Sequence, residues 1–158
     1  MPGATLPEGT RQRIVLLVGL PGSGKSTWAA RQGISPLSSD HVRELLADDA
    51  TDQTIHARVF ATLRYLLRQR LAVGRPVTYV DATHLTPAER KPYVEIAQWY
   101  GCDLEAVVFD VPVEVCIERN RGRGRVVPET AIRAMAEKLQ IPTEEEGFCA
   151  IQIVRVDI

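Results

Sequence analysis

The sequence predicts an α/β fold with three layers, in which a parallel five-stranded sheet is covered by helices on both faces. Strand-like segments alternate with helix-like segments along the chain, and parallel strands need helical crossovers between them. A glycine-rich motif lies between the first strand and the first helix. The chain has 158 residues, 45% of them hydrophobic, which suits one domain with a substantial core. We therefore expect a single domain over residues 1–158, with residues 1–11 as a loose leader.

Four of the expected strands are apolar runs rich in β-branched residues, as in sheets that are buried on both faces. A further strand is a short extended segment that is followed directly by a helix. In chain order the five expected strands are Ile14–Val18, Ser35–Asp40, Val77–Asp81, Leu104–Val111 and Ala150–Val156.

Helices are expected between these strands. Thr86 marks one helix start, because an N-cap threonine, Pro87 at the first helical position and Glu89 together form a capping-box pattern. The long segment Gln53–Val73 has apolar residues at helical spacing and is followed by Gly74 and Pro76, which end it. The other expected helices start at Thr27 or cover His41–Ala47, Val113–Asn120 and Pro128–Leu139.

Residues Gly19–Thr27 read GLPGSGKST, which matches the phosphate-binding pattern G-x-x-x-x-G-K-[ST]. Glycines allow successive backbone N–H groups to approach the oxygens of a nucleotide. Lys25 is then expected to reach the β- and γ-phosphates, and the hydroxyl of Ser26 to bind Mg²⁺. A glycine turn that only joins strand to helix is the alternative. The motif predicts nucleotide contacts from Gly22, Ser23, Gly24, Lys25, Ser26 and Thr27.

A phosphate-binding loop is common to switches, motors and kinases, so the acceptor side must discriminate between them. Phosphoryl transfer needs a base for the acceptor proton and cations for the transferring group. Asp40 lies where the second strand ends and a helix begins, at the sheet edge where ligands bind, and is the candidate general base. Arg43, one helical turn further on, is a candidate for holding an acceptor phosphate. A helix N-cap role for Asp40 and a solvated helix surface for Arg43 are the alternatives.

Two further features are expected at the same edge of the sheet. Asp81 ends its strand as a Walker-B-like carboxylate that can hold a Mg²⁺-bound water or orient Arg43, and a turn-forming Asp is the alternative. Residues Arg119–Arg125 read RNRGRGR and are expected to form a mobile basic loop between two helices. One of its arginines is a candidate arginine finger, and its glycines let the loop close as a lid. A plain solvated loop is the alternative.

Composition excludes several classes of protein. The net charge of −1 argues against a strongly cationic nucleic-acid binder, so any such contact must come from a local concentration of arginine. Cys102, Cys116 and Cys149 lack metal-binding spacing, and we expect them to be small buried residues in a reducing compartment. Neither a membrane span nor a secretory signal is recognisable. These features predict a soluble protein of the cytoplasm.

Four segments resemble, in order and spacing, the P-loop polynucleotide 5′-hydroxyl kinase family, such as the kinase domain of phage polynucleotide kinase. They are GLPGSGKSTWA, SSDHVR, VDATHLTPAER and VFDVPVEVCIERNRGRGRVVP. The resemblance implies a P-loop NTPase fold with an arginine-rich lid, and Mg²⁺-dependent transfer of phosphate from ATP to 5′-hydroxyl ends of DNA or RNA, as in nucleic-acid repair. Only the kinase half of the phage enzyme is matched, because its phosphatase domain has no counterpart here.

The resemblance also implies roles for individual residues. Lys25, Asp40 and Arg123 are the implied catalytic residues, with Asp40 as general base and Arg123 stabilising the transition state. Arg119 is implied to be a second phosphate contact, so that both arginines join the ATP-binding set. On the acceptor side, the resemblance implies a 3′-phosphate contact from Arg43 and support from Asp81 and Thr83.

The sequence departs from the family at two places. His84 stands where the phage enzyme has Asn, and we expect this histidine to be a solvent-facing loop residue. The lid is one residue shorter, so Arg121 and Arg125 are alternatives to Arg123 as the finger. The stretch Pro142–Phe148, PTEEEGF, is similar to one in many small kinase-like P-loop ATPases, and the nucleotide base is expected near it.

Three functions are consistent with these features. The leading hypothesis is an ATP- and Mg²⁺-dependent polynucleotide 5′-hydroxyl kinase. A kinase of a sugar, nucleoside or antibiotic hydroxyl is the rival, and the lack of a global basic field favours it. The third hypothesis is a nucleotide-dependent binding module in which hydrolysis acts as a conformational timer. Preference for DNA or RNA, the donor nucleotide and the oligomeric state stay open.

Overall fold

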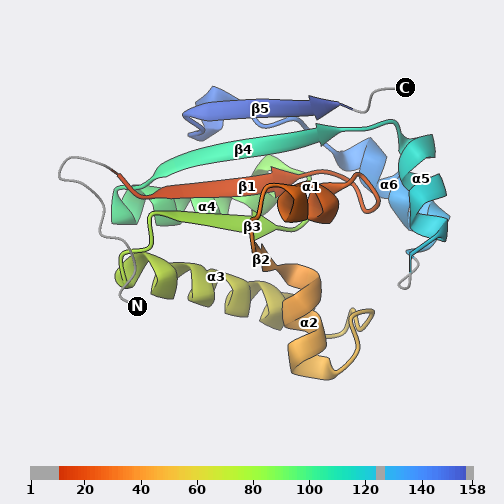
Figure 1. Ribbon diagram of the computed structural model, residues 1–158, viewed down its shortest axis with the longest axis horizontal. Helices are drawn as coiled ribbons and strands as arrows, with labels where there is room; N and C mark the ends of the chain where they lie inside the picture. Colours follow the sequence, from red (N-terminus) through yellow and green to blue (C-terminus); the bar gives the residue numbers. More distant parts are fainter. Residues whose placement is uncertain (1–10, 124–126, 156–158) are drawn as a thin grey trace.

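The protein, described here by a computed structural model over residues 11–123 and 127–155, is built on one parallel sheet. The strand order is β2-β3-β1-β4-β5. The carboxyl ends of the strands lie at one edge of the molecule, on the right in Figure 1. The expected parallel five-stranded sheet is confirmed. Its strands are β1 (Arg13–Val18), β2 (Leu37–Ser38), β3 (Val77–Asp81), β4 (Asp103–Asp110) and β5 (Ala150–Arg155).

Helices cover both faces of this sheet, as the alternating pattern predicts. Alternate residues of β1 belong to two different core clusters: Leu16 packs with α3 and α4, whereas Leu17 packs with α1, α5 and α6. Figure 1 shows α1 in front of the strands and α4 behind them. The helices are α1 (Lys25–Arg31), α2 (Ser39–Ala47), α3 (His56–Ala72), α4 (Pro87–Tyr100), α5 (Val113–Arg121) and α6 (Glu129–Lys138), with a short 3-10 helix η1 (Glu144–Glu146) before β5.

Local sequence features account for the ends of α4 and for the buried face of α3. Thr86 and Glu89 form the expected reciprocal capping box at the start of α4, and Gly101 ends that helix in the left-handed conformation. In α3, four buried residues recur every fourth position and face the sheet: Val59, Leu63, Leu67 and Leu71. Burial of this stripe is the main stabilising contribution to α3, because helix propensity alone is marginal.

Three expectations about local structure are corrected. Arg119 to Arg121 continue α5, so the first part of the arginine segment is helical rather than loop. Arg11 is not part of a loose leader, because its guanidinium donates to the carbonyls of Gly101 and Cys102 and pairs with Asp103; residues 1–10 lie outside the described residues. Cys102 and Cys116 are buried as expected, but Cys149 is exposed directly before β5.

Within residues 11–123 and 127–155, no helix is long and apolar enough to cross a membrane.

Candidate active site

The loop after β1 requires glycine at two positions. Gly22 has φ +81°, and a Cβ atom there would lie 2.4 Å from the carbonyl oxygen of Cys116 in α5. Gly24 has φ +95° and is the N-cap of α1, with no side chain to bond the first N–H groups of that helix. Ser23 Oγ is buried and has no hydrogen-bond partner among the described residues. These unpaired donors fit the phosphate groups of a nucleotide.

Lys25 begins α1 and folds back over the loop. Its ammonium group donates to the carbonyls of Gly19 and Leu20, at 2.9 Å each, and its side chain is almost fully buried. Burial lowers the pKa of this ammonium group, while the carboxylates of Asp81 and Asp40 oppose that shift. The loop therefore holds a poorly solvated cation next to two carboxylates.

Asp81 at the end of β3 faces the same loop. Ser26 Oγ donates to Asp81 Oδ2 at 3.1 Å, and the carboxylate is 7% exposed. Burial raises the pKa of Asp81, and the charge of Lys25 opposes this. The alternative of a turn-forming strand-end Asp is not supported, because the side chain points to α1. Two residues further on, the carbonyl of Thr83 accepts a hydrogen bond from the N–H of Gly19 at 3.1 Å.

Asp40 lies in the first turn of α2, directly after the edge strand β2. The N-cap of α2 is Ser38, whose hydroxyl accepts a bond from the N–H of His41, so the N-cap alternative for Asp40 is wrong. Burial is the largest influence on the pKa of both Lys25 and Asp81, and the charge of Asp40 is a smaller one that raises each pKa. The structure thus brings Asp40 into the electrostatic neighbourhood of the phosphate loop.

Arg43 lies one turn further along α2 and is 4% exposed, so the alternative of a solvated helix surface is wrong. Its Nη1 donates to the carbonyl of Asp52 at 3.0 Å, which ties α2 to the segment before α3. Its Nε is buried and has no partner among the described residues. The Nη1 group of Arg43 therefore has a structural hydrogen bond, whereas its Nε–H group is available to donate to a ligand.

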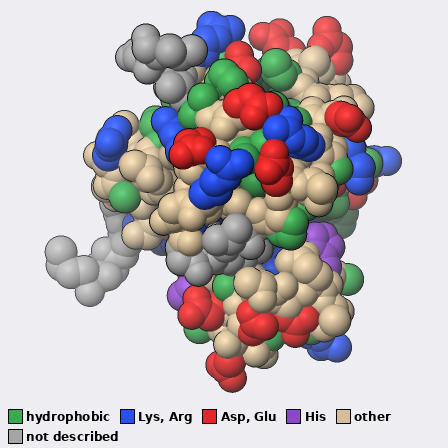
Figure 2. Space-filling view, turned by 90° about the vertical axis from the view of Figure 1, so that its right-hand side faces the viewer, with side chains coloured by type: hydrophobic (Ala, Val, Ile, Leu, Met, Phe, Trp, Pro, Cys, Tyr) green, Lys and Arg blue, Asp and Glu red, His purple; other side chains and the backbone are tan. Residues whose placement is uncertain are grey.

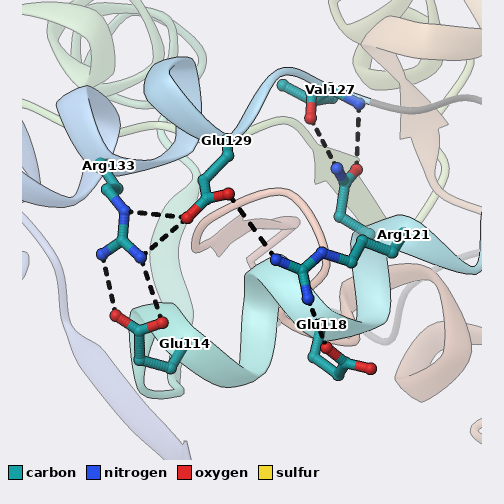
Figure 3. Close-up of polar contacts among 7 residues, drawn as sticks. Glu114, Glu118, Arg121, Val127, Glu129 and Arg133 are labelled. Atoms are coloured by element: carbon teal, nitrogen blue, oxygen red, sulfur yellow. Dashed lines mark hydrogen bonds and ion pairs between the residues drawn. The ribbon is translucent and has the colours of Figure 1, made fainter.

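The arginines at the end of α5 divide into two groups. Arg119 Nη1 lies 3.3 Å from the position of a Cβ atom at Gly24, over the phosphate loop. Arg123 lowers the pKa of both Lys25 and Asp81, in each case as a smaller influence than burial and the Lys25–Asp81 attraction. Arg121 instead pairs with Glu118 and Glu129 (Figure 3). Arg125 lies outside the described residues.

Asn120 was not predicted from the sequence. Its buried side-chain amide donates to the carbonyl of Val127 at 2.6 Å and accepts from the N–H of Val127 at 3.1 Å. Figure 3 shows these two bonds beside the ion pairs that join α5 to α6, in which Arg133 bridges Glu114 and Glu129. The Asn120–Val127 clasp therefore closes the base of the segment that carries Arg123.

His84 is buried, so the expectation of a solvent-facing residue is wrong. It is 3% exposed, and its φ of +50° is in the left-handed region that His and Asn adopt more readily than most residues. Its Nδ1 lies 2.6 Å from the carbonyl oxygen of Leu17 and carries the proton, because a carbonyl oxygen only accepts. Burial lowers the pKa of the imidazole to about 4. His84 thus joins the end of β3 to the strand that leads into the phosphate loop.

Arg90 is a second residue that sequence reasoning missed. Its side chain is fully buried, bonds both carboxylate oxygens of Glu146 at 2.9 and 3.0 Å, and donates to the carbonyl of His84 at 2.7 Å. Glu146 also accepts from the N–H of Thr143. This network fixes the Pro142–Phe148 turn against the segment behind the phosphate loop.

The expected Mg²⁺ site has few candidate protein ligands. The described part of the chain contains no group of three His, Cys, Asp or Glu side chains that could hold a metal ion. Ser26 and Asp81, however, place two oxygens side by side next to the phosphate loop. This pair fits Mg²⁺, which typically takes one or two protein oxygens and completes its octahedral shell with phosphate and water.

Figure 2 looks onto the edge where the carboxyl ends of the strands lie. Acidic and basic side chains are interspersed over the upper part of this face, and acidic side chains gather on its lower part. This face is therefore mixed in charge rather than uniformly basic.

The sequence profile of one family, described as AAA domain, matches residues 14–142. The chain belongs to this family. The matched region runs from β1 through α6, so it includes the phosphate loop, α2 and the arginine-bearing end of α5. The fold described above is thus that of an AAA domain with the architecture of a P-loop kinase.

Two curated relatives are kinases. The chain is 28% identical over 148 residues to the bifunctional polynucleotide phosphatase/kinase of Schizosaccharomyces pombe, covering 90% of this chain and 33% of that protein. It is 25% identical over 138 residues to the L-seryl-tRNA(Sec) kinase of Methanococcus maripaludis, covering 82% of this chain and 53% of that protein. The chain therefore spans between a third and about half of these relatives.

A solved structure of the Pnkp1/Rnl/Hen1 complex also matches this AAA domain. The match has a TM-score of 0.61 and 26% identity, and covers 77% of this chain and 42% of the other. Both types of comparison support the P-loop kinase family. The acceptor differs among the relatives, so family membership does not itself identify the substrate.

Proposed function

We propose that this chain transfers the γ-phosphate of ATP to the 5′-hydroxyl end of a DNA or RNA strand. The observation that carries the proposal is that Asp40, in the first turn of α2, lies near enough to Lys25 and Asp81 for its charge to influence the pKa of both. A switch or motor needs a phosphate loop and a metal-side carboxylate, whereas a kinase also needs a base for its acceptor. The name of the fission-yeast relative supports a polynucleotide as that acceptor.

In the proposed reaction, Asp40 accepts the proton of the 5′-hydroxyl as its oxygen bonds to the γ-phosphorus. The bond between that phosphorus and the β,γ-bridging oxygen breaks in line, and ADP leaves. Lys25, Arg119 and Arg123 neutralise the charge on the transferring group. Positioning and charge stabilisation account for the catalysis, since the protein forms no covalent bond itself.

On the acceptor side, Arg43 and Thr83 are proposed to position the terminal nucleotide. The unpaired Nε of Arg43 is the donor available for a phosphate, because Nη1 is already bonded to Asp52. Ser26 and Asp81 would hold Mg²⁺, directly or through water, and the ion would supply positive charge to the β- and γ-phosphates.

The test is transfer of radiolabelled γ-phosphate from ATP to single-stranded DNA and RNA with 5′-hydroxyl ends. We expect labelled oligonucleotide, no labelling of strands that already carry a 5′-phosphate, and little labelling of free nucleosides or sugars. A strand with a blocked 5′ end controls for transfer to other positions. If neither DNA nor RNA strands with 5′-hydroxyl ends were labelled, the proposal would be overturned.

A kinase of a different hydroxyl, on a small molecule or on an aminoacyl-tRNA, is the second candidate, and two observations favour it. The acceptor edge is mixed in charge, and one relative is named as a kinase of seryl-tRNA. This candidate predicts labelling of a small alcohol or of an aminoacyl-tRNA seryl group in preference to oligonucleotide ends. A nucleotide-dependent binding module instead predicts ATP hydrolysis with no labelled acceptor.

A further inference from the structure

Helix α3 is strongly basic in a chain whose net charge is −1. Residues His56–Ala72 include four arginines and no aspartate or glutamate. Arg70 is used internally, since it donates to the hydroxyl of Thr78 and the carbonyl of Val77. Arg58 is exposed, on a different side of the helix from Arg64 and Arg68. The last two lie one turn apart, so their side chains project from the same face.

Arg64 and Arg68 line a shallow groove of about 410 Å³ between α3 and α4. The α4 side is apolar and aromatic, and consists of Pro92, Ile96, Trp99 and Tyr100. Glu95 also lines the groove, but among the described residues no carboxylate lies within ion-pair distance of Arg64 or Arg68. Among the described residues, the two arginines therefore line the groove without an ion-pair partner, and Glu95 is the acidic side chain beside them.

Trp99 is the unusual member of this groove. It is 86% exposed, and the neighbouring Tyr100 is 39% exposed, whereas Trp28 packs edge-on against Phe109 in the core. An indole ring costs free energy when it is left in water, and its flat face is a stacking platform. A pair of cations beside such rings is the arrangement that binds the phosphates and bases of an unpaired strand.

We propose that the α3–α4 groove binds single-stranded nucleic acid, with Arg64 and Arg68 on successive phosphates and Trp99 stacked on a base. This inference rests on the proposed function, because the strand is the substrate itself. The occupant follows from charge complementarity: an acidic peptide would use the arginines but has no need of a flat aromatic platform, and a membrane surface would require a broader cationic face.

The groove is connected to Asp40 through the contact between α3 and α2. Helix α3 packs against α2, which carries Asp40, and runs away from it below the sheet (Figure 1). Arg64 comes eight residues after His56, which is about 12 Å along the helix axis. An acceptor with its 5′ end at Asp40 must extend past α2 and along α3 to reach the groove, so the groove contributes to long acceptors and not to short ones.

The experiment compares acceptors of two lengths, about 15 and about three nucleotides, in steady-state assays with saturating ATP. The groove variants are Trp99→Ala and the pair Arg64→Gln/Arg68→Gln. The matched control is Arg31→Gln/Arg58→Gln, which removes two exposed arginines outside the groove. Circular dichroism melting verifies that each variant is folded.

For the long acceptor we expect KM to rise about tenfold in the groove variants, while kcat is unchanged. For the short acceptor, and for the control pair, we expect KM within about twofold of the wild type.

Direct binding separates this inference from the proposed function. Fluorescence anisotropy of a 3′-labelled strand should show weaker binding in both groove variants, and the slope of log K against log salt should become shallower by about 1.4 in the arginine pair. Groove-dependent binding without phosphorylation would overturn the proposed reaction and leave the groove intact. Three results would overturn the groove assignment. The first is a loss of kcat/KM in the groove variants that is equal for the long and the short acceptor, and the second is strand binding by these variants that equals that of the wild type. The third is a changed oligomeric state of Trp99→Ala.

Discussion

Ser26 Oγ donates a 3.1 Å hydrogen bond to Asp81 Oδ2, and this contact joins the first turn of α1 to the end of β3. The two residues are far apart in sequence, but β1 and β3 are hydrogen-bonded neighbours, so their carboxyl ends lie side by side. The geometry places a hydroxyl and a carboxylate side by side at the start of α1, next to the loop that we propose binds the β- and γ-phosphates of a nucleotide. Such a pair is suited to a hydrated divalent cation.

Asp81→Asn tests this pair. The amide keeps the size of the side chain but removes the negative charge beside Lys25, so Mg²⁺ should lose a partner while the loop keeps its shape. We expect the gain in ATP affinity on adding Mg²⁺ to fall about tenfold or more, as for other residues that support a metal ligand. Calorimetric titration of ATP with and without Mg²⁺ measures this directly. An unchanged Mg²⁺ effect would show that Asp81 has no part in metal binding.

Asp40→Asn tests the general base. It should leave ATP binding intact and lower kcat by about 10²- to 10⁴-fold, the usual contribution of a positioned base. Asp48→Asn is the matched control, because Asp48 is an exposed carboxylate at the C-cap of the same helix. We expect the control to keep wild-type turnover. Near-normal transfer by Asp40→Asn would remove this residue from the role.

The arginines at the end of α5 are expected to differ sharply in function. Arg123→Ala should lower kcat by about 10²-fold or more with a smaller effect on ATP affinity, because a finger acts on charge that develops in the transition state. Arg121→Ala should change kcat by less than about threefold, since its guanidinium pairs with Glu118 and Glu129. Single-turnover assays with both variants measure the contrast. If the two variants lost activity equally, the division made here would be wrong.

Asn120→Ala should act through Arg123. Loss of both bonds to Val127 releases the segment that carries Arg123, so we expect kcat to fall about tenfold. In a double-mutant cycle, the Asn120 substitution should have little further effect in an Arg123→Ala background, because coupled residues are not additive. Additive losses in the cycle would make Asn120 a purely structural residue.

Much of the fold follows from local pattern. The alternation of strands and helices, the capping box of α4 and the glycine-rich loop each depend on residues a few positions apart, and all were predicted. Apolar residues at helical spacing predict the buried face of α3 for the same reason. The phosphate loop could be predicted because glycine spacing alone determines where its backbone can approach a ligand.

The supporting residues could not be predicted because their partners are distant in sequence. Arg90 meets Glu146 across 56 positions, and the carbonyl that bonds His84 is 67 positions away. A histidine in a loop looks exposed until neighbouring strands enclose it. Asn120 and Val127 are close in sequence, but nothing in RNRGRGR distinguishes an asparagine that closes a loop from one that faces water. Tertiary contacts decide these cases.

His84 gives the protein a specific dependence of stability on pH. Burial, with smaller contributions from the charges of Lys25 and Arg90, lowers its folded-state pKa from 6.5 to about 4. The unfolded chain therefore binds a proton at a pH at which the folded chain does not, and stability is lost as pH falls from about 6.5 towards 4. The full contribution is about 3 kcal/mol.

Urea unfolding at several pH values between 7.5 and 4 measures this loss, with His84→Asn as the variant, since asparagine also tolerates the left-handed backbone. The variant should show a shallower decline in unfolding free energy than the wild type over that range. His41→Asn, which removes an exposed imidazole, should follow the wild-type curve. If His84→Asn followed it too, the imidazole would have to be accessible to protons in the folded protein, and its burial between β3 and the phosphate loop would be incorrect.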